Sequence, residues 1–117
     1  MSEDIRPVTW LGDSKKQVQN FPPEVRKSIG AALYDAQKGQ KAPTAKPFKG
    51  IGSGIFEIAV RFDTNAYRTV YAVQIGKQIY VLHAFQKKSK AGISTPKQDV
   101  HLIGQRYRQA VTMEKES

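Results

Sequence analysis

The chain has 117 residues, a length that fits one domain with a modest core, and we expect a single domain over residues 1–117. Hydrophobic residues make up 39% of the chain, and none of its apolar runs is long enough to cross a bilayer. Cysteine is absent, which excludes disulfides and thiolate metal sites. The first residues lack the charged and then apolar pattern of a signal peptide, so we expect a cytoplasmic protein.

Positive charge dominates the sequence. Nineteen Lys and Arg residues stand against ten Asp and Glu, for a net charge of +9. The charge is clustered: residues 38–49 hold four lysines and no acid, and residues 87–108 hold six cations with Asp99 as their one acid. A basic composition can serve solubility alone, but clustered cations in a small chain favour an anionic partner, with RNA or DNA first.

In chain order, the first predicted elements are a short strand and two helices. Residues 7–11 (PVTWL) predict the strand, and residues 15–20 predict a brief helix after a turn. Two prolines then open a second helix, whose apolar residues recur at helical spacing as far as a left-handed cap at Gly39. A loop rich in Lys, Pro and Gly follows over residues 40–54.

A meander of three strands and a final helix complete the chain. We expect a turn over residues 63–66 and a two-residue hairpin at Gly76 and Lys77. Thr95 and Pro96 resemble a capping box that opens the final helix, and residues 114–117 are expected to fray. The strands are predicted at residues 56–62, 67–75 and 78–85.

This order of elements predicts an α+β fold. A small antiparallel sheet, made of the N-terminal strand and the meander, would carry the two N-terminal helices and the C-terminal helix on one face. The other face would then be open. Alternation along the strands places the tyrosines at 67 and 71 in the core and Glu57, Arg61 and Arg68 on the open side. There, Arg68 would either pair with Glu57 across the strands or clamp a phosphate.

The segment over residues 80–90 (YVLHAFQKKSK) leads a histidine and an aromatic residue into a run of lysines. RNA cleavage by attack of the 2′-hydroxyl needs a proton acceptor, a proton donor and cations at the phosphate. His83 or His101 would move the protons, with Glu57 as another base, while a buried structural role for His83 is the alternative. No pair at fixed spacing decides among these. The charge would be stabilised by Arg68, Lys87 and Lys88.

Other cations outside this cluster are expected to bind RNA or the ribosome: Lys46, Lys49, Arg61, Lys90, Lys97, His101 and Arg108. The glycines of residues 49–54 (KGIGSG) precede a strand and lack the GK[ST] ending, so we expect a flexible turn there and no phosphate loop. With two histidines and no cysteine, the sequence predicts no metal site, and we expect no cofactor.

Five phrases, in this order, resemble the HigB-like branch of the RelE/ParE toxin superfamily, often described as phage-derived toxin-like proteins. The resemblance covers residues 8–110, and the predicted order of elements matches the fold of that superfamily. The phrases are VTWLGDSKK from residue 8, LYDAQKG from 33, KPFKGIGSGIFEI from 46, YRTVYAV from 67 and IYVLHAFQKKSKAGISTP from 79.

The resemblance implies a toxin of a toxin–antitoxin pair that cuts mRNA in the ribosome, with an antitoxin protein, the ribosome and mRNA as its partners. The arginine of the family's tyrosine–arginine strand motif falls on Arg68, and the basic pair past the last strand falls on Lys87 and Lys88. Glu57 stands where RelE carries a lysine, and RelE's C-terminal catalytic tyrosine has no clear counterpart. Glu57 and His83 would then be substitute proton carriers.

Two other functions stay open. One is a ParE-like poison of DNA gyrase, which binds a protein and needs no RNA-cleaving residues. The other is a phage-derived nucleic-acid-binding protein without catalysis. The density of cations after the last strand favours the nuclease over the gyrase poison.

Overall fold

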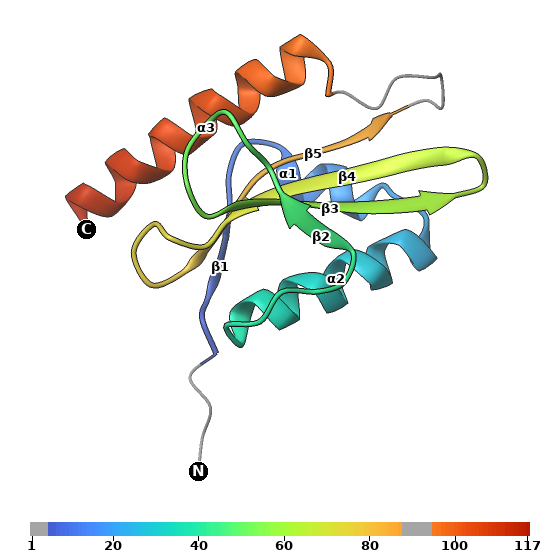
Figure 1. Ribbon diagram of the computed structural model, residues 1–117, viewed down its shortest axis with the longest axis horizontal. Helices are drawn as coiled ribbons and strands as arrows, with labels where there is room; N and C mark the ends of the chain where they lie inside the picture. Colours follow the sequence, from blue (N-terminus) through green and yellow to red (C-terminus); the bar gives the residue numbers. More distant parts are fainter. Residues whose placement is uncertain (1–4, 88–94) are drawn as a thin grey trace.

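The computed structural model describes residues 5–87 and 95–117. A sheet lies at the centre, with helices on both of its faces (Figure 1). No helix in the described part of the chain has the length and apolar character needed to cross a membrane. The elements are β1 (Val8–Trp10), α1 (Ser14–Gln19), α2 (Pro23–Gln37), β2 (Ala45–Pro47), β3 (Ile55–Phe62), β4 (Asn65–Ala72), β5 (Ile79–Lys87) and α3 (Lys97–Glu116).

The sheet has five strands in the order β1-β5-β4-β3-β2. The predicted α+β class is confirmed, but the prediction of an antiparallel sheet is wrong at one edge. There, β1 runs parallel to β5, with Val8 opposite Ile79 and Trp10 opposite Val81. The remaining pairs are antiparallel. The first strand thus pairs with the last, and such a parallel pair needs a long crossover instead of a hairpin.

Strand β2 occupies the other edge, inside the loop predicted over residues 40–54. It pairs antiparallel with β3, with Ala45 opposite Ile58 and Lys46 opposite Glu57. A three-residue strand ending in Pro47 has too little alternation to be recognised from sequence. Its shortness and its proline suit a sheet edge, because both limit pairing with other chains.

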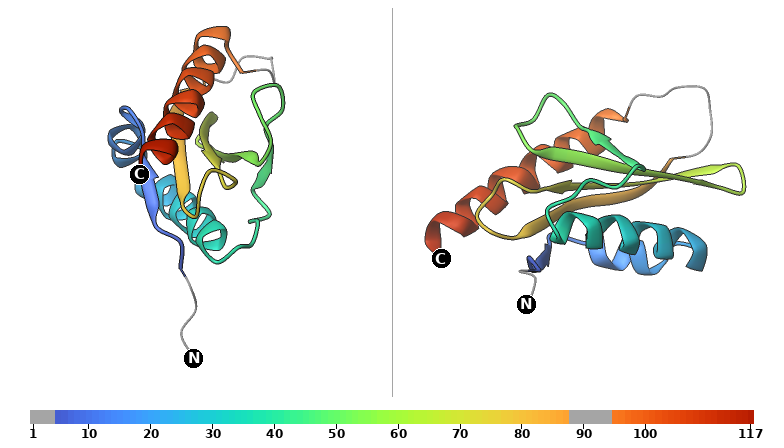
Figure 2. Two further views of the ribbon diagram at one scale, coloured as in Figure 1. Left: turned by 90° about the vertical axis from the view of Figure 1, so that its left-hand side faces the viewer. Right: turned by 60° about the horizontal axis from the view of Figure 1, so that its bottom comes forward.

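Helices cover both faces of the sheet, so the prediction of helices on one face and an open second face is wrong (Figure 2). Helices α1 and α2 pack on one face, where Val25 and Ile29 of α2 meet Ile58 and Tyr71. Helix α3 lies across the other face over β5. It packs there because its own apolar stripe matches apolar residues on that side of the sheet. This second cluster contains Ile55, Val70, Leu82, Ile103 and Ala110.

The two hairpin connections differ from those predicted. Strands β3 and β4 join through Asp63 and Thr64 alone, both with positive φ (52° and 66°), as in the mirror-image turns that suit tight hairpins. The turn predicted over residues 63–66 is therefore shorter. The connection predicted at Gly76 and Lys77 is longer and spans residues 73–78.

The ends of α2 agree with the sequence-based prediction, whereas those of α3 differ from it. Pro23 opens α2, and Gly39 has a φ of 83° just after its end, as predicted. The capping box predicted at Thr95 is wrong, because the cap position of α3 is Pro96 and no side chain bonds to it there. Helix α3 continues to Glu116 and so includes most of the segment predicted to fray, residues 114–117.

Candidate nucleic-acid interface

The strand register brings six predicted site residues onto the sheet face that carries α3. Lys46, Glu57 and His83 lie in one row across the strands, with Val70 between the last two. Cross-strand partners point to the same side of a sheet and lie about 5 Å apart. Arg68 lies in the next row, and Arg61 and Lys87 flank Ala66 in the row beyond. We call this set the basic face: Lys46, Glu57, Arg61, Arg68, His83 and Lys87.

A bulge in β5 decides which residues belong to this face. Val70 pairs with His83, but the next residue, Tyr71, pairs with Val81, so Leu82 is an extra residue in β5. Without it, simple alternation would put Tyr80 and His83 on opposite faces. With it, His83 and every second residue beyond it turn toward α3. The bulge therefore brings Lys87 to the same face as Arg68.

Arg68 and Glu57 form a buried ion pair on the basic face. Nη1 of Arg68 donates to Oε1 of Glu57 at 3.0 Å, and the two side chains are 12% and 5% exposed. The predicted cross-strand pairing is thus confirmed. Within the described residues, the other carboxylate oxygen of Glu57 and Nε of Arg68 are buried and have no hydrogen-bond partner. The pair therefore keeps one acceptor and one donor unsatisfied, and a buried unmade hydrogen bond is costly.

His83 is held between two side chains of α3. Its Nε2 lies 2.7 Å from Oδ1 of Asp99, and its Nδ1 lies 3.0 Å from Nη1 of Arg106. Because a guanidinium can only donate, Nδ1 is the acceptor, and the ring proton sits on Nε2 and is donated to Asp99. The ring also stacks on Phe85, with 5.2 Å between centroids. Both nitrogens are engaged in bonds that attach α3 to β5.

Arg106 extends this network to the start of α1. It also donates to the carbonyl oxygen of Leu82 at 3.1 Å, and it lies 3.1 Å from Oδ1 of Asp13. Partial burial raises the pKa of Asp13, but bonds with Gln17 and Arg106 outweigh that and leave the pKa below 3.8. The sequence patterns indicate no role at the site for Asp13, Asp99 or Arg106. Asp99 and Arg106 share helical spacing with Ile103, which could have placed them on the buried side of α3.

Four other predicted cations are exposed on α3 or in the segment between β2 and β3. Lys97, His101 and Arg108 are exposed on α3, with Lys97 in the same turn as Asp99. Lys49 is exposed in the segment between β2 and β3, which packs on the α3 side of the sheet through its neighbouring apolar residues. Lys88 and Lys90 lie outside the described residues. Within the described residues, no three His, Asp or Glu side chains gather to hold a metal ion.

Residues 16–108 match the family of phage-derived Gp49-like proteins. The chain belongs to this family. The match spans the whole basic face and most of α3, and it confirms the phage-derived branch of the RelE/ParE superfamily that the sequence resembles. A chain of the RelBE2 toxin–antitoxin complex from Mycobacterium tuberculosis matches with a TM-score of 0.47 and 15% identity, over 71% of this chain and 99% of that one. A likeness at this level says nothing of what this chain binds. No curated protein matches.

Proposed function

We propose that this Gp49-like protein is the toxin of a toxin–antitoxin pair and that it cleaves mRNA on the ribosome. The observation that carries the proposal is the basic face. It joins a buried Glu57–Arg68 pair, which has one acceptor and one donor without a partner among residues 5–87 and 95–117, to the cations Lys46, Arg61 and Lys87. In an RNA substrate, the 2′-hydroxyl can donate to the carboxylate of Glu57, and an oxygen of the scissile phosphate can accept from Nε of Arg68.

In this proposal, Glu57 is the base and Arg68 stabilises the phosphate. Oε2 of Glu57, which has no hydrogen-bond partner among the described residues, takes the proton of the 2′-hydroxyl. The oxygen of that hydroxyl attacks phosphorus while the bond to the 5′-oxygen breaks. The leaving 5′-oxygen gains a proton from water or from the ammonium of Lys87 or Lys88. Nε of Arg68 donates to the phosphate as charge develops, which is the part of such reactions where fixed donors contribute most. The products are a 2′,3′-cyclic phosphate and a 5′-hydroxyl.

His83 has a positioning role in this proposal instead of a proton-transfer role. Both of its ring nitrogens are bonded, so a proton transfer would have to break its bond to Asp99 or to Arg106. We also propose that Lys49, Lys90, Lys97, His101 and Arg108 bind the phosphates of mRNA or ribosomal RNA.

The test is brief induction in bacteria, followed by mapping of mRNA 5′ ends. We expect cuts at defined positions within translated codons. Glu57→Gln and Arg68→Lys should each reduce cleavage by at least about 100-fold, as losing a base or a positioned charge does elsewhere. Lys15→Gln, an exposed change on α1, is the matched control and should cut normally. Intact transcripts would overturn the proposal, and intact transcripts with inhibited supercoiling would favour the gyrase poison.

A further inference from the structure

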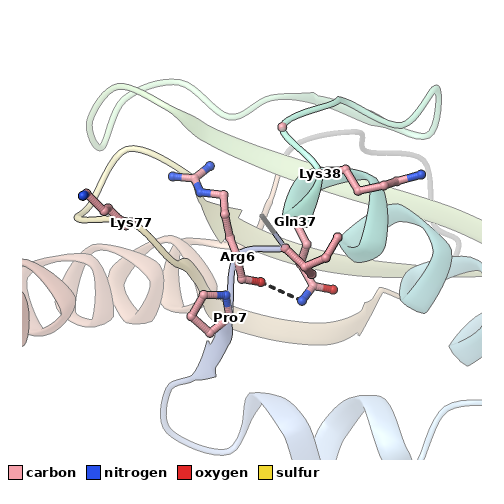
Figure 3. A pocket seen from close by; sticks show the side chains of 7 residues that line it. Arg6, Pro7, Gln37, Lys38 and Lys77 are labelled. Carbon is pink, nitrogen blue, oxygen red and sulfur yellow. Dashed lines mark hydrogen bonds between the residues drawn. The ribbon is translucent and has the colours of Figure 1, made fainter. Parts of the chain in front are cut away.

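Two adjoining pockets lie at the start of the sheet, between the segment before β1 and the end of α2. The larger has a volume of about 420 Å³ and is lined by Arg6, Gln37, Lys38 and Lys77 among others (Figure 3). The smaller, about 160 Å³, shares Arg6 and reaches inward to Tyr71. We call the two together the Arg6 pocket. Its size is within the range of sites that bind a small ligand or a few side chains.

The Arg6 pocket and the basic face lie on opposite faces of the sheet. Phe56 and Tyr71, which line the inner part of the pocket, are cross-strand partners that point to the α2 side of the sheet. Glu57 follows Phe56 in β3, and successive side chains of a strand point to opposite faces, so Glu57 points to the α3 side. A molecule in this pocket would therefore be separated from the proposed cleavage site by the thickness of the sheet.

Hydrogen bonds within the fold hold the wall of the pocket in place. The backbone N–H of Arg6 donates to the carbonyl of Gln37 at 3.1 Å, and the Gln37 amide donates back to the Arg6 carbonyl at 2.7 Å. The Arg6 guanidinium donates to the carbonyl of Val73 at 2.8 Å. These bonds connect the segment before β1 to α2 and to the end of β4. The cationic side chain is thus held in place before any partner arrives, which lowers the entropy lost on binding.

Four cations line the pocket, and among the described residues two acids lie close to them. Lys77 and Arg6 lie on one side in Figure 3 and Lys38 on the other, with Lys41 lining the inner part. The acids are Asp35, whose Oδ1 is 3.8 Å from Nζ of Lys38, and Glu114, whose carboxylate lies beside Gly76, the residue before Lys77. This rim matches carboxylates of a partner.

Between the cations the lining is apolar. This favours a peptide over a nucleic acid as the molecule that occupies the pocket. Ile5 is 41% exposed at the mouth, and Phe56 and Val73 line the interior. A nucleic acid uses exposed aromatic rings to stack its bases, but Tyr71 is only 1% exposed. A protein segment that carries an apolar side chain between acidic ones fits both the floor and the rim.

We infer that the Arg6 pocket docks an acidic segment of the antitoxin, with an apolar side chain of that segment inserted between Arg6 and Lys38. This inference rests on the proposed function for the existence of the partner. Because the pocket and the basic face lie on opposite faces of the sheet, docking here anchors the antitoxin without touching the cleavage residues. Affinity for the antitoxin and toxicity are therefore separable by mutation.

The test compares two charge-reversing variants of the full chain. Lys38→Glu/Lys77→Glu alters the pocket, and Lys15→Glu/Lys27→Glu makes the same change in net charge at exposed sites on α1 and α2. The probe is the purified product of the gene adjacent to the toxin gene, titrated by calorimetry. We expect the pocket variant to bind at least about 10-fold more weakly, and the control to bind like wild type. Both should arrest growth, but co-expression of the adjacent gene should rescue only the control.

Each other outcome has a definite meaning. If the wild type arrests growth and the pocket variant is rescued like the control, the inference is wrong and the proposed function stands. If the wild type is not toxic, the proposed function fails, whatever the titration gives. If the adjacent product does not bind the wild type, or if the pocket variant changes self-association or RNA affinity, the pocket has another occupant and the inference is wrong. If the double variant has a lower melting temperature than wild type, the test is repeated with Lys77→Glu alone, which changes no residue of α2.

Discussion

Arg106 donates a hydrogen bond to Nδ1 of His83 at 3.0 Å, and this one contact fixes the tautomer of the histidine. The ring must then carry its proton on Nε2, where Asp99 accepts it at 2.7 Å. A residue that looks like a catalyst in the sequence is thus the centre of the contact between α3 and β5. The same guanidinium reaches Asp13, so one side chain connects α3, β5 and the start of α1.

Replacing Arg106 should therefore weaken the fold. Arg106→Leu removes the bonds to His83, Asp13 and the Leu82 carbonyl, and we expect a loss of about 3 kcal/mol in the free energy of unfolding. The matched control is Arg108→Leu, an exposed position on the same helix, which should change stability by less than about 0.5 kcal/mol. Urea denaturation measures both. Equal stability of the two variants would contradict this role of Arg106.

The Glu57–Arg68 pair allows folding to be separated from activity. Glu57→Ala leaves the Arg68 guanidinium buried and unpaired, and we expect a loss of about 3 kcal/mol. Glu57→Leu together with Arg68→Met replaces both charges by apolar groups and should be much closer to wild type in stability. That double variant should fold and yet leave mRNA intact. Cleavage by a folded double variant would show that the pair is not the catalytic centre.

Much of the fold can be predicted from local patterns. The apolar stripe of α2 and the alternation of β3 are strong periodic signals, and Val25, Ile29 and Ile58 are all buried as those signals predict. Strand β2 gives no such signal, because three residues are too few to show a period. The parallel pairing of β1 with β5 is set by packing across the whole domain, which no local pattern encodes.

The candidate site could be predicted only in part. The pairing of Glu57 with Arg68 follows from alternation on two neighbouring strands, and it is confirmed. The place of His83 depends on the extra residue Leu82, and a bulge of this kind has no mark in the sequence. Its partners Asp99 and Arg106 come from a helix that was expected on the other face. Long-range packing therefore decided what the histidine does.

Acid should remove the contribution of Asp13 to stability. The folded-state pKa of Asp13 lies below 3.8, chiefly because the bonds with Gln17 and Arg106 outweigh partial desolvation. The folded protein thus favours the charged form, so the contribution is present above about pH 4 and is lost as the pH falls through the folded-state pKa. We expect Asp13→Asn to melt below wild type at pH 7 and to match it near pH 2. A difference that persists at pH 2 would point to a cause other than charge.

Alkali should act through Tyr80. Burial, and then the Glu114 carboxylate that accepts its hydroxyl proton at 2.7 Å, raise the pKa of Tyr80 to about 12. The folded protein therefore favours the neutral phenol, and this contribution is present below about pH 10 and is lost as the pH rises through about 12. Absorbance titration should show a tyrosine that ionises near pH 12, and Glu114→Gln should lower that value. Burial also raises the pKa of Tyr71 to about 12, so Tyr80→Phe should reduce the amplitude of the step near pH 12 and leave the part due to Tyr71. An unchanged amplitude would show that Tyr80 does not ionise in this range.

The hairpin between β3 and β4 should be stabilised by glycine. Thr64 has a φ of 66°, where a β-branched residue is strained by about 1–3 kcal/mol. Thr64→Gly relieves this strain, and the extra freedom of glycine in the unfolded chain offsets only about 0.5–1 kcal/mol. We expect a net gain of about 1 kcal/mol, seen as a rise of about 4 °C in melting temperature. Thr112→Gly, the same change at an exposed position inside α3, should instead cost about 0.5 kcal/mol. If both variants lost stability, the positive φ of Thr64 would not be a source of strain.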